Sequence, residues 1–509
     1  MSIIQSFYRD RNPTTAEDAY TQQVNTALRH ELKGKKIAVI TIGLKGYGDY
    51  ACARKVCRYL LEKLAVELKN LALVGSVPEL FKLKDVCTLS FDFDSVRSWG
   101  PDLQIFIPIA DYSFVSPLLI CKDTATLAIR EYGYKRPEDF DKDPNVHAYA
   151  MGLAPGSLGI LIDHSLNAGE KSTAFKSLPS YLQIALHGNQ SEEAFDGRFY
   201  LGYAHISREI ISFVRAIVQM NDELKDERPL RFFFLGKPRI NIDKLTEALG
   251  RDKYTLANKS SSSAIDQYTW TGKRSIHMIT AEVHPDVVPL LHQAAEEEEL
   301  GTGDQTFSQI ISKNVMPAME VFQHKRNLME QFYKALPSEI IKKGRFYYEN
   351  KNKYSNYTEE DPEIFKLELY KSEQKWLLNP EGLAEFHIER KRSVRFRNAV
   401  KQAMQEIAET YDFGPRFEEA LKNLLEKTRH LEKQEKFTYR SIKLSDKWTA
   451  DMIPFDQNIL LSLDDVIKLD LQRSTGLSGL SMFSDSTFSF FRVGSGLEDP
   501  YIVRRTKLK

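Results

Sequence analysis

The sequence predicts an α/β protein that contains two doubly wound parallel sheets and a helical appendage. Its 509 residues hold short, continuous apolar runs that have the length of buried strands. Amphipathic stretches of helical length separate these runs, and the alternation occurs twice along the chain. Such alternation is typical of parallel sheets with helices on both faces, and the chain is long enough for about three domains.

The first αβ half, residues 35–200, follows a polar segment over residues 1–34. The run KIAVITIG begins at Lys35 and has the uninterrupted apolar character of a buried parallel strand. A helix is predicted over residues 51–68, where apolar residues recur at helical spacing. The sequence predicts further strands at 71–77, 86–91, 102–109 and 156–163.

The second αβ half, residues 201–337, repeats this pattern. Apolar runs predict three strands, over 229–238, 275–283 and 316–322. The segment LGTGD, residues 300–304, is interpreted as a loop because of its two glycines. Helical periodicity predicts helices over 206–224, 242–249, 286–295, 305–313 and 325–336.

The region after Pro337 differs in composition from both halves. Residues 338–435 are highly charged and carry two stretches of helical periodicity, which predicts a helical appendage packed on the second half. Residues 436–509 form a tail that we expect to be partly flexible, because its last 35 residues or so are rich in Ser, Gly and Phe and lack clear periodicity. Tails of this composition occur in bacterial effectors, and an effector that acts in a host cytoplasm is therefore one expectation.

The overall composition excludes several classes of protein. Lys plus Arg equals Asp plus Glu, 70 of each, and this balance argues against a nucleic-acid-binding protein. The chain shows no signal-peptide-like apolar core and no run of about 18 apolar residues, so we expect a cytoplasmic protein without a membrane span. It also lacks Walker A, GxSxG and HExxH patterns, which disfavours P-loop enzymes and the hydrolases that those patterns mark.

The first candidate for chemistry is the segment Gly46-Tyr47-Gly48-Asp49, between the first strand and the first helix. Glycines let the backbone approach a ligand, and a helix N-terminus favours an anion. Asp49 follows a parallel strand at its carboxyl end, where ligands of doubly wound sheets bind. The alternative is a plain turn in which Asp49 caps the helix.

The second candidate extends from Gly301 to Lys325. The amides of Gln305 and Thr306, at a predicted helix start, are suited to hold a diphosphate together with the Thr306 hydroxyl. Glu320 ends a predicted strand and is suited to accept hydrogen bonds from a ribose diol, and Lys325 is suited to neutralise phosphate. Taken singly, the carboxylates of this segment have an ordinary structural interpretation, and Glu296–Glu299 would repel a diphosphate unless they face away.

These segments resemble the GT-B class of nucleotide-sugar glycosyltransferases, in which two facing Rossmann-like domains hold acceptor and donor. GYGD resembles the loop of heptosyltransferases and protein-arginine rhamnosyltransferases, and GTGDQTFSQIISKNVMPAMEVFQHK resembles the donor motif of such enzymes. The resemblance covers residues 35–336 and implies an acceptor domain over 35–200 and a donor domain over 201–337.

The resemblance also implies roles for individual residues. Asp49 corresponds to the general base of inverting members. Asp304, Gln305 and Thr306 would face the donor phosphates or sugar, and Glu320 the ribose. The other donor-binding candidates are chosen by their position and charge, and they are Gly46, Gly48, Lys237, Arg239, Gly303, His324 and Lys325. Helix N-termini and basic side chains would then stabilise the departing nucleoside diphosphate without a metal or another cofactor. Asp92-Phe93-Asp94 is a DxD sequence, and it keeps a metal-dependent alternative open.

The expected function is therefore transfer of a hexose or deoxyhexose from a nucleoside-diphosphate sugar to an acceptor, with a protein as one acceptor class. Two alternatives remain open on the same scaffold. One is a non-catalytic interaction protein whose working surface is the appendage and tail. The other is a nucleotide-sugar epimerase, which would release a modified sugar or nucleotide without an acceptor.

Overall fold

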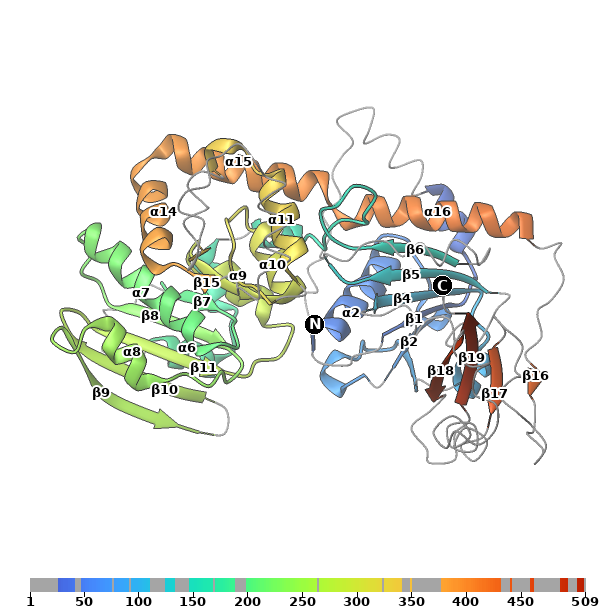
Figure 1. The fold of residues 1–509 in the computed structure, drawn as a ribbon, viewed down its shortest axis with the longest axis horizontal. Helices are drawn as coiled ribbons and strands as arrows, with labels where there is room; N and C mark the ends of the chain where they lie inside the picture. Colours follow the sequence, from blue (N-terminus) through green and yellow to red (C-terminus); the bar gives the residue numbers. More distant parts are fainter. Residues whose placement is uncertain are drawn as a thin grey trace. The chain divides into compact units, whose positions relative to one another are not determined.

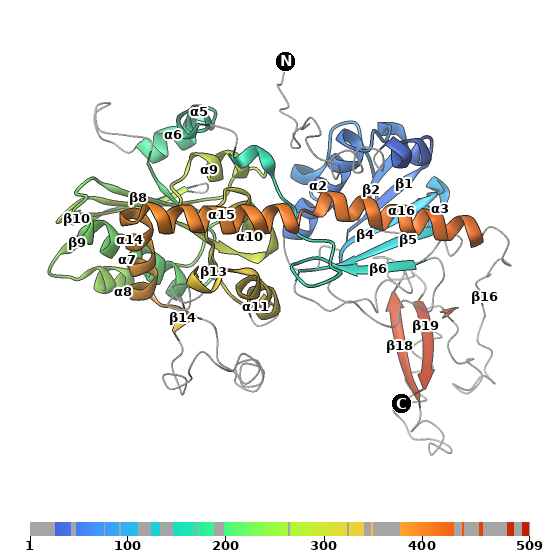
Figure 2. The ribbon, with the colours of Figure 1, turned by 90° about the horizontal axis from the view of Figure 1, so that it is seen from above.

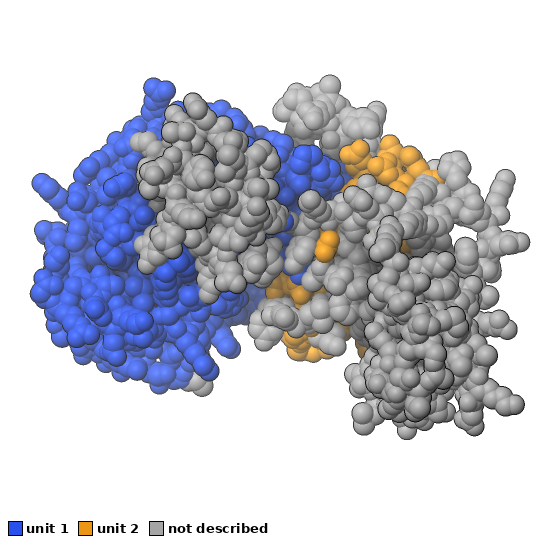
Figure 3. Space-filling model, in the orientation of Figure 1, with its two compact units in different colours: residues 1–16, 131–135, 150–416 blue, residues 17–130, 136–149, 417–509 orange. Residues whose placement is uncertain are grey.

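The chain divides into two compact units in the computed structural model (Figure 3). Unit 1 comprises residues 1–16, 131–135 and 150–416, and unit 2 comprises residues 17–130, 136–149 and 417–509. The structure describes residues 26–41, 47–75, 77–90, 93–109, 124–132, 146–167, 170–187, 198–262, 265–322, 325–340, 348–349, 377–431, 440–441, 458–461, 486–492 and 501–507.

Unit 2 contains a six-stranded sheet with the order β3-β2-β1-β4-β5-β6. Neighbouring strands from β3 to β5 are parallel. Apolar residues from five of these strands form its core with Val96, as their continuous apolar sequences require. The strands are β1 (Ile37–Ile40), β2 (Leu71–Val74), β3 (Cys87–Leu89), β4 (Leu103–Ile109), β5 (Ala125–Arg130) and β6 (Val146–Ala150), and the helices include α2 (Tyr47–Glu62) and α3 (Phe93–Trp99).

Unit 1 contains a seven-stranded sheet with the order β13-β12-β7-β8-β11-β10-β9. The five strands from β13 to β11 are parallel, and β10 and β9 extend the sheet as an antiparallel hairpin. Strands β7, β8, β11, β10 and β9 of this sheet are labelled in Figure 1, in shades of green. The strands are β7 (Tyr200–Gly202), β8 (Leu230–Leu235), β9 (Tyr254–Ser261), β10 (Ile265–Gly272), β11 (Ile276–Ala281), β12 (Glu299–Thr302) and β13 (Ala318–Glu320).

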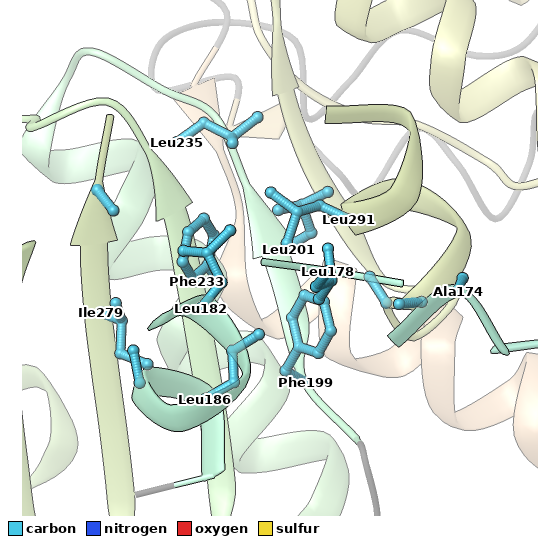
Figure 4. Close-up of a cluster of buried hydrophobic side chains, with 14 residues drawn as sticks. Ala174, Leu178, Leu182, Leu186, Phe199, Leu201, Phe233, Leu235, Ile279 and Leu291 are labelled. Atoms are coloured by element: carbon cyan, nitrogen blue, oxygen red, sulfur yellow. The ribbon is translucent and has the colours of Figure 1, made fainter. Parts of the chain in front are cut away.

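Helices cover both faces of the unit 1 sheet (Figure 2). Phe233 of β8 points into a buried cluster with residues of α5, α6 and α9 (Figure 4), whereas the neighbouring Phe232 packs edge-on against Phe213 of α7. Adjacent strand residues thus serve opposite faces, as the pleat requires. The helices are α5 (Lys171–Lys176), α6 (Ser180–His187), α7 (Ser207–Glu223), α8 (Ile242–Leu249), α9 (Val288–Ala294), α10 (Gly303–Ser312) and α11 (Arg326–Ala335).

Three further helices follow, namely α14 (Pro380–Arg392), α15 (Val394–Thr410) and α16 (Phe413–Leu431). Helix α14 packs on α7, and α15 packs on α10. The division between the units falls within α16, at residues 416 and 417. A short strand β15 (Leu377–Leu378), which pairs with β14 (Tyr348–Glu349), lies beside α7 and β13.

The predicted α/β fold class is confirmed, because both halves contain Rossmann-like sheets with parallel cores, followed by C-terminal helices. The division between the units differs from the predicted position at residue 200. It lies near residue 150, because α5 and α6 pack against β7 and β8. Residues 156–163 were predicted to form a strand, but they form only isolated bridges in the structure.

Strands β5, β6, β7, β9, β10, β14 and β15 had no counterpart in the sequence prediction. The segment LGTGD is not wholly a loop, because its first three residues belong to β12. The tail contains a four-stranded sheet, β16-β17-β19-β18, where no regular structure was expected. Its strands are β16 (Arg440–Ser441), β17 (Asn458–Leu461), β18 (Ser486–Arg492) and β19 (Tyr501–Lys507). Within the described part of the chain, no helix combines the length and the apolarity that crossing a membrane requires.

Candidate functional site

The strand order of unit 1 reverses between β7 and β12. The chain runs from β7 outward through β8 and β11, and it then returns to place β12 and β13 on the other side of β7. In open parallel sheets, ligands bind beyond the carboxyl ends of the strands at such a reversal. The two segments that meet this condition are residues 203–206 after β7 and the start of α10 after β12.

The start of α10 presents backbone N–H groups for which the described residues show no side-chain cap. Its N-cap residue, Thr302, makes no side-chain capping bond, and the buried Thr302 Oγ1 has no hydrogen-bond partner within the described residues. Gly303 has φ +73°, and a Cβ built there would meet nothing within 4 Å, so the space over its backbone is open. Free amides, a positive helix end and open space together suit an anion.

Lys325 is held between two carboxylates of unit 1. Its Nζ lies 2.8 Å from the Asp304 carboxylate and 2.9 Å from Glu131 Oε2. All three side chains are at most 17% exposed, so solvent screens the charges weakly. The triad therefore carries one excess negative charge directly beside the start of α10.

Burial and this excess charge determine how the triad titrates. Burial lowers the pKa of Lys325, but the charges of Asp304 and Glu131 outweigh burial and hold that pKa above its ordinary value. Burial raises the pKa of Asp304, and Lys325 only partly offsets the effect. Lys325 is therefore a permanent cation whose charge is already satisfied by protein groups.

Glu320 stabilises the loop after β7. Its carboxylate accepts hydrogen bonds from the backbone N–H groups of His205, at 3.0 and 3.1 Å, and Ile206, at 2.6 Å. Ile206 is the N-cap residue of α7, and its own side chain makes no capping hydrogen bond. Glu320, at the end of β13, supplies a side-chain acceptor at this helix start instead. Glu320, which was predicted to bind the ribose, is therefore buried and already hydrogen-bonded to the backbone of this loop.

Gly303, Glu320 and Lys325 share one small pocket. The apolar side chains of Met319, Leu328 and Met329 contribute to its lining. The structure thus brings together four of the predicted donor residues, because Asp304 contacts Lys325 directly. Thr306 is also buried, with its methyl group beneath Gly301, and the Gln305 side-chain oxygen has no partner within the described residues.

Other predicted residues lie apart from this group. Lys237 donates to the Ser262 carbonyl oxygen and lies 3.3 Å from Asp266 Oδ1, so its ammonium group is already paired with residues of the β9–β10 hairpin. Arg239 is exposed. His324, Gly46 and Asp92 fall outside the described residues, as does the side chain of Asp94 in α3. The residues that the structure describes contain no cluster of His, Cys, Asp and Glu suited to a metal ion.

The first candidate segment lies at the equivalent reversal of unit 2. Strand order there changes between β1 and β4, and α2 begins directly after β1. Asp49 lies in the first turn of α2 and is half-buried, and Gly48 is exposed. Burial, and secondarily the charge of Asp49, raise the pKa of the neighbouring Tyr50. The segment thus presents a carboxylate at the ligand-binding edge of its own sheet.

The sequence analysis missed Glu131, Tyr132 and Thr302. Tyr132 is fully buried, and its backbone N–H donates to Asp304 at 3.3 Å while its hydroxyl contacts Ser308 Oγ at 2.9 Å. Glu131 follows β5, a strand that was not predicted, so its place at a strand end gave no signal. The acidic run Glu296–Glu299 faces away from the site and is bound by basic residues at the opposite end of β12.

Comparisons with known proteins give distant structural likenesses. No family model matches the sequence, and no curated protein sequence matches it. Among solved structures, HepE of Anabaena in complex with UDP and glucose covers 77% of this chain and all of its own, at 9% identity and a TM-score of 0.41.

Two further structures show a similar likeness. A putative UDP-N-acetylglucosamine 2-epimerase of Listeria monocytogenes covers 79% of this chain and 98% of its own, at 9% identity and a TM-score of 0.39. EarP, described in arginine glycosylation of translation elongation factor EF-P, covers 76% of this chain and 99% of its own, at 10% identity and a TM-score of 0.37. These scores lie below 0.5, so function is inferred from this chain's own residues.

Proposed function

We propose that the protein is a nucleotide-sugar glycosyltransferase whose donor diphosphate binds at the start of α10. The observation that carries this proposal is the uncapped N-terminus of α10, which lies at the strand reversal of unit 1 with open space over Gly303. A diphosphate needs several converging N–H donors and a positive end of a dipole. The buried, unpartnered Thr302 hydroxyl adds a further polar group for such a ligand.

The proposed reaction is an inverting transfer. Asp49 accepts the proton of the acceptor's hydroxyl or nitrogen as that atom attacks the anomeric carbon of the sugar. The bond between the anomeric carbon and the phosphate oxygen breaks, and its electron pair leaves with the nucleoside diphosphate. The N-terminus of α10 stabilises this charge together with Lys325, which pairs with Asp304 in the first turn of α10, so no role is assigned to a metal ion.

Thermal unfolding with a nucleotide panel tests donor binding. The protein is heated with UDP, GDP, dTDP, ADP or CMP, each with and without Mg²⁺ or Mn²⁺. A nucleotide at about 100 times its dissociation constant adds about 2.7 kcal/mol to the folded state, so one of them should raise the midpoint without metal. A shift that requires Mn²⁺ would instead favour a metal-dependent site.

Two matched variants separate the proposed roles. Asp304→Asn should weaken nucleotide binding, because Asp304 fixes Lys325 beside the helix start. Asp49→Asn should retain the nucleotide shift but lower transfer by at least about 100-fold, since only the proton acceptor is removed. Equal loss of binding and transfer in Asp49→Asn would contradict its role as a base.

The same assays distinguish the alternative functions. An absence of any nucleotide shift in the wild-type protein would favour an interaction protein on this scaffold. Conversion of a nucleotide sugar in the absence of an acceptor would instead favour an epimerase.

A further inference from the structure

Glu131 and Tyr132 tie the chain after β5 to the candidate donor segment. Tyr132 is the anchor, because it is fully buried and contacts both Asp304 and Ser308 of α10. Its hydroxyl oxygen also accepts a hydrogen bond from the Leu161 N–H at 2.9 Å. These contacts place the neighbouring Glu131 carboxylate on Lys325.

The second carboxylate on Lys325 works against an anionic ligand. Asp304 alone would neutralise the ammonium, and Glu131 adds a negative charge beside the amides that would receive a diphosphate. Two carboxylates and an incoming diphosphate repel one another strongly where side chains are mostly buried. A site that binds diphosphate therefore has to release one of the two carboxylates from Lys325.

The contacts indicate which carboxylate is released. Asp304 lies in the first turn of α10 and accepts a second hydrogen bond from the Tyr132 N–H. Glu131 lies outside any helix or strand, and Lys325 is the sole partner of its carboxylate within the described residues. Release of Glu131 breaks one ion pair and leaves the Tyr132 anchor in place.

We propose that Glu131 is a built-in competitor of the donor diphosphate. It holds Lys325 when the site is empty, and the arriving diphosphate takes its place on the ammonium. This inference rests on the proposed donor site and adds to it a residue that sets the donor affinity. Its consequence is that part of the binding free energy is used to displace Glu131, so that removing its charge strengthens binding.

Isothermal titration of the full-length protein with UDP and with inorganic pyrophosphate tests this inference. Pyrophosphate reports the diphosphate subsite independently of the nucleoside base. Glu131→Gln keeps the length of the side chain and removes its charge, and it should bind pyrophosphate about tenfold more tightly, with a difference that shrinks as salt is raised. A merely structural role of Glu131 would not increase affinity.

Glu79→Gln is the matched control for net charge. Glu79 pairs with Lys82 on an exposed surface of unit 2, and its variant should bind as the wild-type protein does. Wild-type binding combined with equal or weaker binding by Glu131→Gln would overturn the competitor role and leave the proposed function standing. A similar gain in Glu79→Gln would also overturn it. Failure of the wild-type protein and Glu131→Gln to bind either compound would overturn both proposals.

Discussion

The carboxylates near the two ends of strand β12 differ in how many cationic side chains they contact. At its amino end, the four residues Glu296–Glu299 are matched by a surplus of lysine and arginine partners, drawn from α5, α14, α15 and the end of α10, and His292 of α9 also contacts Glu299. The cationic partners are Lys171, Lys313, Arg390, Lys391 and Lys401. At its carboxyl end, Asp304 and Glu131 share the single cation Lys325.

The difference separates a structural charge cluster from the proposed ligand site. At the amino end, burial alone would raise the pKa of Glu298, but Arg390 and Lys391 outweigh burial and hold it well below its ordinary value. At the carboxyl end, the pKa of Asp304 is raised, chiefly by burial. Each carboxylate at the amino end has its own cationic partner, whereas the two carboxylates at the strand reversal share one lysine and keep an excess negative charge.

The largest expected effect on stability is at the amino end. Arg390→Met removes a buried guanidinium that binds Glu297 at 2.9 Å and also contacts the buried Glu298. Because it leaves carboxylates without their main partner, we expect a loss of about 3 kcal/mol in the free energy of unfolding. Urea unfolding measures this loss.

Lys401→Ala provides the control for Arg390→Met. Lys401 binds the same Glu297, at 3.0 Å, but its side chain is about half exposed. Its removal should cost less than about 1 kcal/mol. Equal losses in the two variants would mean that burial does not distinguish these ion pairs.

A smaller effect concerns pH and His387 of α14. Burial, reinforced by the charges of Arg390 and Lys391 and opposed by Glu297 and Glu298, lowers the pKa of His387 to about 3. The unfolded chain takes up this proton near pH 6.5, whereas the folded chain does not, so stability falls as the pH drops below 6.5.

Between pH 7 and pH 5, this residue should remove about 2 kcal/mol from the free energy of unfolding. His387→Asn should flatten the pH dependence over that interval by the same amount, whatever its effect on stability at pH 7. Urea unfolding at pH 7, 6 and 5 compares the two slopes. Parallel curves for wild-type and variant would show that His387 is not held neutral by burial.

The sequence predicted the parallel strands better than the charged parts of the site. Strand β8 is apolar apart from the buried Arg231, so its sequence indicates burial. Strand β12 begins with Glu299, which is buried because His292 and Lys313 bind it from helices on either side in the sequence. No local sequence pattern indicates that Glu299 is paired in this way. Residues 300–302 were therefore interpreted as part of a loop.

The sequence likewise predicted some residues of the candidate site but not the contacts that they make. Asp304, Glu320 and Lys325 follow from their places at helix and strand ends. Their actual partners do not, because Glu131 reaches Lys325 across 194 residues and Glu320 binds backbone amides across 115. Such contacts depend on tertiary packing, which strand periodicity does not encode.

The smallest expected change in stability gives the sharpest test of the carboxyl end. Gly303→Ala places a Cβ at φ +73° in open space, so only backbone strain opposes it, at a cost of about 1 kcal/mol. Gly156→Ala is matched to it, because Gly156 has φ +74° in the same unit and nothing within 4 Å of its Cβ position. Both variants should therefore lose similar stability in urea. Only Gly303→Ala should also lose affinity for pyrophosphate, since its methyl group occupies the space over the start of α10. Unchanged affinity of Gly303→Ala for pyrophosphate would show that the diphosphate does not bind at the start of α10. The interpretation of Glu296–Glu299 as a structural charge cluster would be unaffected.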